Sequence, residues 1–433
     1  MKQRYTAFFS VCWVMGIGMM LVSGCDTPEP MPEPTAGRLV FTQYTALGDG
    51  FTAGMRDAAP EYPDGYAGLH VQAQTYAYPA LLAAQFGQVS NVTFTQHMTR
   101  DVGSGMRVLA SLMPNHCGAL DPIPAFDWKD AEPGWSLLPI AGTIIHNLGV
   151  PMLRLEDTDQ DVVCQANPFF RRINTPGASQ YEELVQAQDI SFFTLWIGLE
   201  DMLAYGLRGG KGPVPADEDV FEAHLNRLIL AATDSGRSQG IIGTLPDITR
   251  FPYFAAQMAW KPSPENCYVQ KPLYIQDFTG EVRPALPGDR ILLAARAFME
   301  VDNRGLSPQS PIPDSLVLDQ HEVLLIQRLT TAYNARIDSL VQRYNAAAPA
   351  PCLAIADLHS WFEEVYQGIT EDGLQISGSY LIGGVFAADG LYLTPRGNAL
   401  VANQFIGAIN TFYPFRALIN TLNPTDFDGV VFP

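Results

Sequence analysis

Residues 45–54 read TALGDGFTAG, a glycine-rich turn at the end of an apolar segment. We expect residues 38–47 to form a first β-strand, with Gly48, Asp49 and Gly50 directly after it. Along the rest of the chain, short apolar runs bounded by glycine or proline alternate with helical patterns. Such alternation, with strands that are apolar on both faces, is typical of a parallel sheet covered by helices.

The other predicted elements continue this alternation. We expect strands at residues 190–197, 240–245 and 352–357, a helix from residue 78 that ends at Gly87, and helices at residues 221–233, 320–344 and 396–410. The predicted fold class is therefore α/β, a doubly wound sheet of about five parallel strands flanked by helices. Ligands of such sheets bind at the carboxyl ends of the strands, where we expect residues 48–50, Gly198 and the loop before Thr394.

The N-terminus has the features of an export signal. Lys2 and Arg4 precede an apolar stretch over residues 7–22, and the stretch meets the sequence LVSGC, which ends at Cys25. A basic end, a short apolar run and small residues before the cleavage point are typical of a signal peptide, although an uncleaved apolar anchor is the alternative. The LVSGC segment resembles a bacterial lipobox, which implies that residues 1–24 are removed and that Cys25 is lipidated.

Residues 25–37 follow as a tether rich in proline and glutamate, and its composition favours an extended chain. Residues 38–433 then form the predicted folded domain. The expected location is the cell envelope, on the outer membrane or on a periplasmic or extracellular face, with the lipid as the contact to the membrane. The sequence does not indicate a protein partner.

The chain is acidic. It has 26 basic and 45 acidic residues, a formal net charge of −19 at pH 7. Removal of residues 1–24 takes away two basic residues and no acid, which leaves 24 basic against 45 acidic residues, or −21. This balance argues against nucleic acid as a partner, because the chain lacks the positive charge that neutralises phosphate.

Four cysteines remain in the expected mature domain: Cys117, Cys164, Cys267 and Cys352. An even number in an exported chain predicts two disulfides, with three possible pairings. A metal site made of all four would need closer pairs than these spacings offer. We therefore expect no metal and no cofactor.

Four segments in order resemble the SGNH/GDSL hydrolase superfamily, in particular a large bacterial lipoprotein subfamily of the Bacteroidota type. They are TALGDGFTAG at 45–54, HNLGVPM at 146–152, FTLWIGLED at 193–201 and GGVFAADGLYLTPRG at 383–397. The resemblance extends over about residues 38–433 and implies an SGNH-hydrolase-like, flavodoxin-like sheet. It also implies an active site at the rim where the four segments meet.

The residues that give the superfamily its name are all replaced in this chain. Gly50 stands where the family has its nucleophilic serine, and Met152 stands where the family has a glycine whose N–H serves the oxyanion hole. Glu200 replaces the oxyanion asparagine, and Tyr392 replaces the histidine base. The chain keeps the partner aspartate of that histidine, the glycine and aspartate of the third segment and the aspartate before the lost serine: Asp389, Gly198, Asp201 and Asp49.

These replacements predict that the usual serine mechanism is absent. Gly50 offers no hydroxyl, and loss of the serine or histidine of a comparable triad costs about 10⁶ in turnover. An ionised Glu200 about 4 Å from a developing oxyanion would oppose it by roughly 4 kcal/mol at an effective dielectric near 20. Tyr392, with a phenol pKa near 10, cannot act as a base at neutral pH without strong tuning. Met152 can offer its N–H only if its backbone keeps the conformation of the family's glycine, and a conformation open to glycine alone would not permit this.

Two other sources of chemistry remain open. A relocated pair would combine the hydroxyl of Thr52 or Ser104 with one of the histidines near the four segments or in loops: His97, His116, His146 and His359. Alternatively, Asp49, Glu200, Asp201 and Asp389 would converge on one rim, where paired carboxylates can act on glycosidic bonds or hold a hard cation.

A structural role for the same carboxylates is the competing interpretation. In the family, the aspartates beside the serine and the asparagine brace loops through backbone N–H groups, and Tyr392 could donate its hydroxyl to Asp389. Glu200 would then lack a partner. The hypothesis is that it binds a basic or hydroxyl-rich ligand group, or helps to hold Ca²⁺.

The function that these observations predict is an envelope-anchored, SGNH/GDSL-hydrolase-like lipoprotein that is catalytically inactive. Its role would be binding or scaffolding, with acylated glycans or lipids as the expected ligands. The alternative is an active ester or glycan hydrolase, a GDSL-type esterase or lipase with relocated or carboxylate groups. A third interpretation is a structural component that uses only its outer surface. An open cleft would favour a ligand, and a plugged cleft would favour a scaffold.

Overall fold

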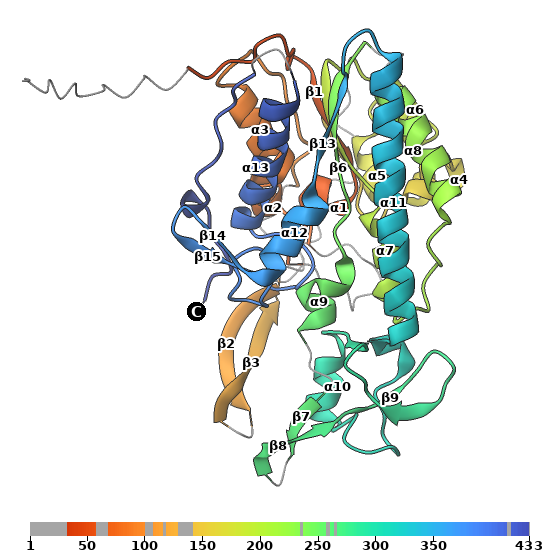
Figure 1. The fold of residues 1–433 in the computed structure, drawn as a ribbon, viewed down its shortest axis with the longest axis vertical. Helices are drawn as coiled ribbons and strands as arrows, with labels where there is room; N and C mark the ends of the chain where they lie inside the picture. The colour runs from red at the N-terminus through yellow and green to blue at the C-terminus, as the bar shows by residue number, and fades with distance from the viewer. Residues whose placement is uncertain are drawn as a thin grey trace, which may run out of the picture. The chain divides into compact units, whose positions relative to one another are not determined.

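Five parallel strands form the central sheet in the computed structural model of the protein (Figure 1). In sheet order they are β13 (Leu353–Ala356), β6 (Gln239–Gly243), β5 (Phe192–Trp196), β1 (Tyr44–Gly48) and β4 (Asn147–Gly149). Every pairing between neighbours is parallel, and all residues of β1 and β5 are buried. The predicted α/β class with a five-stranded parallel sheet is therefore confirmed.

The structure describes residues 33–57, 68–99, 107–115, 118–128, 142–233, 237–256, 260–263, 266–413 and 417–432. The predicted signal peptide, Cys25 and most of the predicted tether lie outside these ranges. Residues Pro34–Pro433 pack as one unit. Within the described ranges, no helix is both long enough and apolar enough to cross a lipid bilayer.

The order of the strands defines where a site can form. Numbered first to fifth along the chain, the parallel strands lie in the order 2-1-3-4-5 across the sheet. This is the flavodoxin-type order, in which the winding reverses between the first and third strands, here β1 and β5. Gly48 and Trp196, the last residues of these strands, pair in register. The turns that follow them therefore start side by side, at the edge where doubly wound sheets bind ligands.

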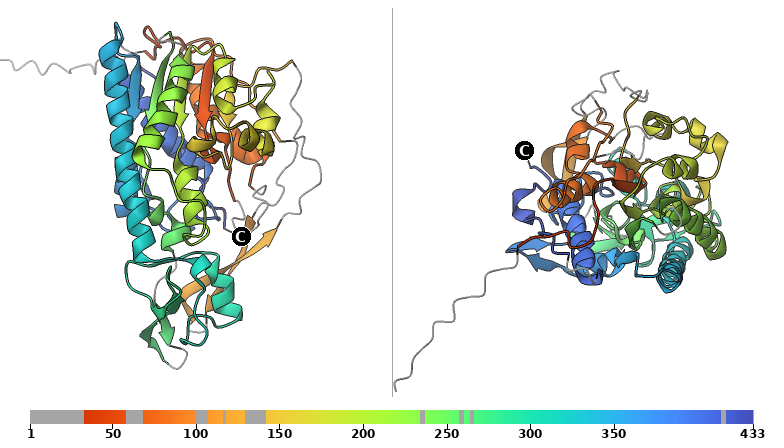
Figure 2. Two further views of the ribbon diagram at one scale, coloured as in Figure 1. Left: turned by 90° about the vertical axis from the view of Figure 1, so that its right-hand side faces the viewer. Right: turned by 90° about the horizontal axis from the view of Figure 1, so that it is seen from above.

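Helices cover both faces of the sheet (Figures 1 and 2). α3 and α13 pack together on one face, and α8 and α11 pack together on the other. The helices are α1 (Gly50–Ala53), α2 (Val71–Thr75), α3 (Tyr78–Phe86), α4 (Asp161–Ala166), α5 (Pro168–Ile173), α6 (Tyr181–Gln186), α7 (Leu199–Gly206), α8 (Glu218–Thr233), α9 (Pro252–Ala255), α10 (Ala295–Val301), α11 (Gln320–Ala347), α12 (Leu358–Gln367) and α13 (Pro395–Phe412). Short 3₁₀ turns are η1 (Leu155–Asp157), η2 (Ile248–Arg250), η3 (Asp314–Leu316) and η4 (Pro424–Asp426).

The longest helix, α11, begins where the sequence predicts and ends three residues later than expected. Its N-terminus carries a capping box: the Asp319 carboxylate accepts N–H bonds of the first turn, and Glu322 accepts the Asp319 N–H at 2.9 Å. This arrangement satisfies amide groups that have no partner within the helix. The predicted apolar stripe is buried, with its last residue partly so: Ile326, Leu329, Tyr333, Ile337, Leu340 and Tyr344.

Small two-stranded antiparallel sheets lie outside the central sheet, and the sequence patterns did not predict them. They are β2 (Arg107–Asn115) with β3 (Gly118–Trp128), β7 (Trp260–Ser263) with β8 (Asn266–Pro272), β9 (Tyr274–Gln276) with β10 (Val282–Pro284), β11 (Arg290–Ile291) with β12 (Val317–Leu318), and β14 (Ile369–Glu371) with β15 (Leu374–Ile376). Strands of two to four residues are too short to show alternation, and the prolines of β3 argue against a strand. The first strand, β1, also starts later than predicted, at Tyr44.

Cysteine pairing differs from the prediction where the structure describes the thiols. Cys164 and Cys352 are free and buried, so they do not take part in the two expected disulfides. The Cys164 thiol instead donates to the Asp157 carbonyl at 3.3 Å. Cys117 and the side chain of Cys267 lie outside what the structure describes. Burial raises the pKa of the Cys164 thiol to about 11, so this thiol is protonated and unreactive at neutral pH.

Candidate functional site

Two turns meet at the point where the winding of the sheet reverses. Asp49 and Gly50 follow β1, and Asp49 caps α1 by accepting the Phe51 N–H at 3.1 Å. Gly198 follows β5 with a φ of 114°, a backbone conformation that side chains rarely adopt. Helix α7 starts directly after it, so Glu200 lies in the first turn of α7, beside α1.

A third segment completes the site from far along the chain. A Cβ atom placed on Gly50 would lie 2.9 Å from Glu200 Oε1 and 3.0 Å from the Tyr392 hydroxyl. This hydroxyl donates to Glu200 Oε1 at 3.2 Å, and the Tyr392 ring lies beside Phe51 with centroids 4.9 Å apart. Three of the four replaced positions therefore converge on one point.

The fourth replaced position, Met152, contributes its backbone. It follows β4 with a φ of 61°, so it keeps the left-handed conformation that favours glycine. Its N–H and that of Gly50 lie close enough to the Glu200 carboxylate to lower the pKa of that group, while the Met152 side chain is 41% exposed. The Glu200 carboxylate thus accepts a hydrogen bond from the Tyr392 hydroxyl and faces two backbone N–H groups that favour its charged form. We call these three groups the donor cradle.

Burial governs the electrostatics of this centre. Glu200 is 5% exposed, and burial raises its pKa from 4.5 to about 7, against the lowering effect of the donor cradle. Burial, and then the nearby charge of Glu200, hold the pKa of Asp49 well above its ordinary value. Burial and close carboxyl groups favour the protonated form. The pKa of Asp49 is therefore raised, and the Glu200 pKa of about 7 places the titration of Glu200 near neutral pH.

The remaining acids of the rim brace loops. Asp201 Oδ2 accepts the Leu155 N–H at 2.8 Å, and burial raises the Asp201 pKa to about 7. Asp389 Oδ1 accepts the N–H groups of Leu391 and Tyr392 at 2.8 and 2.9 Å. The expectation that Tyr392 donates its hydroxyl to Asp389 is wrong, because this hydroxyl bonds to Glu200 instead. The expectation that Glu200 lacks a partner is wrong for the same reason.

Thr52 and Ser104 were considered as relocated nucleophiles, and of these the structure describes only Thr52, which has a structural role. Thr52 is fully buried, and its Oγ1 lies 2.9 Å from the Tyr78 hydroxyl and 3.4 Å from the Trp196 carbonyl. It therefore packs against the sheet, away from the donor cradle. Ser104 and His116 lie outside the described residues.

The described histidines are engaged elsewhere. His146 Nδ1 accepts the Thr95 N–H at 3.1 Å, and its Nε2 lies 2.9 Å from Gln43 Oε1. His359 Nδ1 lies 3.0 Å from the Leu245 carbonyl, and His97 is buried. The three groups nearest to a Cβ atom on Gly50 belong to Glu200, Tyr392 and Met55, and none is a histidine.

A separate cluster has the composition of a metal site. Among the described residues, Asp159, Glu182 and His224 place possible ligand atoms within 4.8 Å of one another. The Arg227 guanidinium lies among them, with Nη2 2.6 Å from Asp159 Oδ2 and Nε 3.2 Å from Glu182 Oε1. This guanidinium already supplies the positive charge, so the cluster is an ion-pair network.

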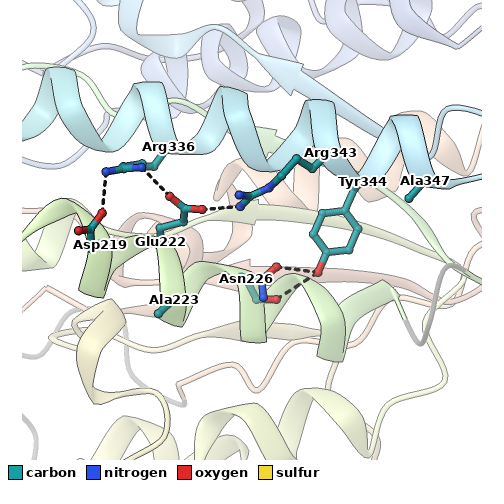
Figure 3. Close-up of a pocket in the computed structure, with 8 residues that line it drawn as sticks. All are labelled: Asp219, Glu222, Ala223, Asn226, Arg336, Arg343, Tyr344 and Ala347. Carbon is teal, nitrogen blue, oxygen red and sulfur yellow. Dashed lines mark hydrogen bonds and ion pairs between the residues drawn. The ribbon is translucent and has the colours of Figure 1, made fainter.

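A pocket of about 720 Å³ lies between α8 and α11 (Figure 3). Its lining residues are Asp219, Glu222, Ala223, Asn226, Arg336, Arg343, Tyr344 and Ala347. The arginines pair with the acids: Arg336 lies 2.6 Å from Asp219 and 3.0 Å from Glu222, and Arg343 bonds to Glu222. The sequence patterns did not predict this pocket. Acids three apart on one helix and arginines seven apart on the next are the available signal, but they do not reveal that the two helices face each other.

The sheet order and the buried donor cradle define the protein as a doubly wound α/β protein with a polar centre at its switch point. No protein-family model matches the chain, and the search of curated proteins finds no significant match.

Proposed function

We propose that this protein is an SGNH/GDSL-hydrolase-like lipoprotein of the cell envelope that is not an enzyme. The observation that supports this proposal best is the position of the Glu200 carboxylate in the donor cradle. In an acyl-transfer enzyme, backbone N–H groups in such an arrangement stabilise the negative oxygen that develops in the transition state. Here the two backbone N–H groups face a carboxylate of the chain itself, that of Glu200.

The four positions of the family signature support the resemblance by their proximity. Gly50, Glu200 and Tyr392 come from three separate segments and lie within contact distance, and the Met152 N–H reaches the same carboxylate. Asp201 braces a loop through the Leu155 N–H, as the resemblance implies, and Asp389 accepts the N–H groups of Leu391 and Tyr392. A random match to short motifs would not bring these residues together.

The burial of the centre favours scaffolding over ligand binding in the inherited cleft. Asp49, Glu200, Asp389 and Tyr392 are each at most 6% exposed, and Gly50 is buried as well. A substrate could reach Gly50 only if Glu200 and Tyr392 moved. We therefore propose that the outer surface carries the role. An acylated glycan or lipid would bind there.

The proposal is tested by labelling the purified protein with a fluorophosphonate and by assaying cleavage of short acyl esters. We expect neither labelling nor cleavage above background, because Gly50 has no hydroxyl and the donor cradle is filled. Stoichiometric labelling of Thr52 or Ser104 would contradict the proposal and favour an active esterase.

Anchoring to the membrane is a separate part of the proposal. Cells that express the protein are grown with radiolabelled palmitate, beside cells that express Cys25→Ser. We expect label in the wild-type protein and none in the variant, because the thiol of Cys25 would carry the lipid. Equal labelling of both would refute the anchor without bearing on catalysis.

A further inference from the structure

Helix α5 carries two consecutive arginines in different surroundings. Arg171 is exposed, whereas Arg172 is buried and only 4% exposed. The N-cap of α5, Asn167, accepts the N–H groups of Phe169 and Phe170 and donates its Nδ2 to the Pro151 carbonyl at 2.9 Å. This bond holds the start of the helix next to the loop that carries Met152.

The Arg172 guanidinium is unpaired in the described part of the chain. Its Nε and Nη2 atoms are buried, and no described group accepts a hydrogen bond from either. Burial lowers the Arg172 pKa to about 10, which still leaves the group positively charged at neutral pH. A buried charge without a partner is strongly unfavourable, so a counter-charge is expected beside it.

The two unpaired atoms, Nε and Nη2, are the two nitrogens with which an arginine side chain binds both oxygens of a carboxylate. Arg154 shows the occupied form of this arrangement: its Nε and Nη2 each donate to one oxygen of the Asp157 carboxylate, both at 2.9 Å. The planar guanidinium presents these two N–H groups in parallel, a fork that matches carboxylate and phosphate oxygens. In Arg172 the same two atoms have no described acceptor, and both are closed off from solvent, so an anion would enter only with a local opening of the packing around α5.

We propose that the Nε and Nη2 fork of Arg172 binds an oxyanion from solution, a group with two oxygens such as a carboxylate or a phosphate. The other arginines that lie near acids illustrate the contrast. Arg227 is held between Asp159 and Glu182, and the arginines of the pocket between α8 and α11 are paired. The net charge of −19 works against non-specific binding of anions, so a response to anions would report on a particular site.

Thermal melts of the full-length protein in three potassium salts test the proposal. Acetate and phosphate are compared with chloride at equal ionic strength. Chloride is a single atom, so it cannot offer two oxygens to the Nε and Nη2 groups. The proteins are the wild type, Arg172→Met, and Arg171→Met as a matched control on the neighbouring exposed arginine. An anion that binds only the folded state raises the Tm as its concentration rises.

We expect acetate, phosphate or both to raise the Tm of the wild type and of Arg171→Met above the chloride value, by the same saturable amount. Arg172→Met should lose this rise, and in chloride it should melt no lower than the wild type, because it removes an unpaired buried charge. A response to acetate alone assigns a carboxylate, and a response to phosphate alone assigns a phosphate. Both results support the site.

The proposal is overturned if wild type and Arg172→Met respond equally to all three salts. It is also overturned if Arg172→Met melts lower in every salt without any difference between salts, since the guanidinium would then have a partner within the chain. If Arg172→Met does not fold, Arg172→Lys replaces it, because lysine keeps the charge but lacks the fork. The Nε–H signal of Arg172 in ¹⁵N-arginine NMR spectra gives a direct readout: it should move on addition of acetate or phosphate, and an unchanged signal refutes binding.

Discussion

The switch point of the sheet and helix α5 both bury charge, but they differ in what surrounds it. At the switch point, the Glu200 carboxylate is met by the N–H groups of Gly50 and Met152 and by the Tyr392 hydroxyl. On α5, the Arg172 guanidinium is met by no described acceptor. The first centre is complete within the chain, whereas the second lacks its counter-charge.

This difference distinguishes a closed site from an open one. Donors that are already paired gain little from a ligand, because a newcomer must first displace the internal partner. A buried charge without a partner gains the full free energy of the new contact when a ligand binds, because no internal bond has to be broken first. The closed site is the one that the hydrolase resemblance concerns, whereas the proposed anion site lies elsewhere, on α5.

The largest expected effect comes from attempts to reopen the closed site. Gly50→Ser alone should leave fluorophosphonate labelling at background, since Glu200 still lies in the donor cradle and none of the three atoms nearest to a Cβ at this position belongs to a histidine. When catalytic groups act together, the loss of one of them costs nearly as much as the loss of all, about 10⁶ in turnover. Labelling is expected only when Gly50→Ser is combined with Glu200→Asn, which frees the donors, and Tyr392→His, which supplies a base. Equally fast labelling of the single and triple variants would contradict a closed site.

The pH dependence of stability sharpens the comparison next. The folded-state pKa of Glu200 is raised from 4.5 to about 7, so the fold favours the protonated form. This stability is fully present below about pH 4.5 and is lost as the pH rises through about 7, an effect on the order of 3 kcal/mol. The pKa of Asp201 is raised in the same direction. The Tm should therefore fall between mildly acidic and mildly alkaline pH.

Melts of Glu200→Gln, which stays neutral, isolate the contribution of Glu200. Its Tm should fall less with pH than that of the wild type. Glu364→Gln changes an exposed glutamate on α12, and it should leave the wild-type slope unchanged. If the Tm of Glu200→Gln falls with pH as steeply as that of the wild type, Glu200 does not titrate in a buried site.

A smaller effect is expected for Tyr392→Phe. The variant removes the hydroxyl that donates to Glu200 at 3.2 Å, and it should lower the free energy of unfolding by about 1–2 kcal/mol at neutral pH. It should also raise the pKa of Glu200, because one donor to the charged form is lost. Tyr344→Phe is the control: its hydroxyl bonds to Asn226 in a partly exposed position, so a smaller loss is expected. Equal losses would show that the Tyr392 hydroxyl has no special role.

The smallest effect concerns the backbone of Met152. Its φ of 61° is strained for a side chain, so Met152→Gly should raise the free energy of unfolding by up to about 1 kcal/mol. Met202→Gly, in the buried first half of α7, should lower it, because it removes packing from a helix. A lower Tm for Met152→Gly would mean that the exposed Met152 side chain packs more than its exposure indicates.

The fold was predictable where a local pattern extends over a whole element. The apolar runs that form β5 and β6 end at Gly198 and Pro246, the run that forms β13 follows Pro351, and the stripe of α11 extends from Ile326 to Tyr344. The strand β4 has three residues, too few for a pattern, and only the resemblance drew attention to its segment. Pairing of distant short strands depends on tertiary contacts that a local pattern does not contain.

The candidate site was predictable in position but not in its contacts. The order of the strands brings Gly50 and Glu200 together, since both follow neighbouring strands at the same edge. The direction of the Glu200 side chain depends on donors from two other segments, and the sequence does not reveal them. Arg172 was missed because arginine in a helix is ordinarily exposed, and its neighbour Arg171 has the same local sequence pattern.

One NMR measurement tests the closed site most directly. Amide ¹⁵N–¹H spectra of the deuterated protein are recorded between about pH 5 and pH 9, for the wild type and for Glu200→Gln. If the Glu200 carboxylate lies in the donor cradle, the amide signals of Gly50 and Met152 move with one shared midpoint near 7, and both stop moving in the variant. Amide signals that stay fixed in the wild type, or that move equally in Glu200→Gln, would contradict the account.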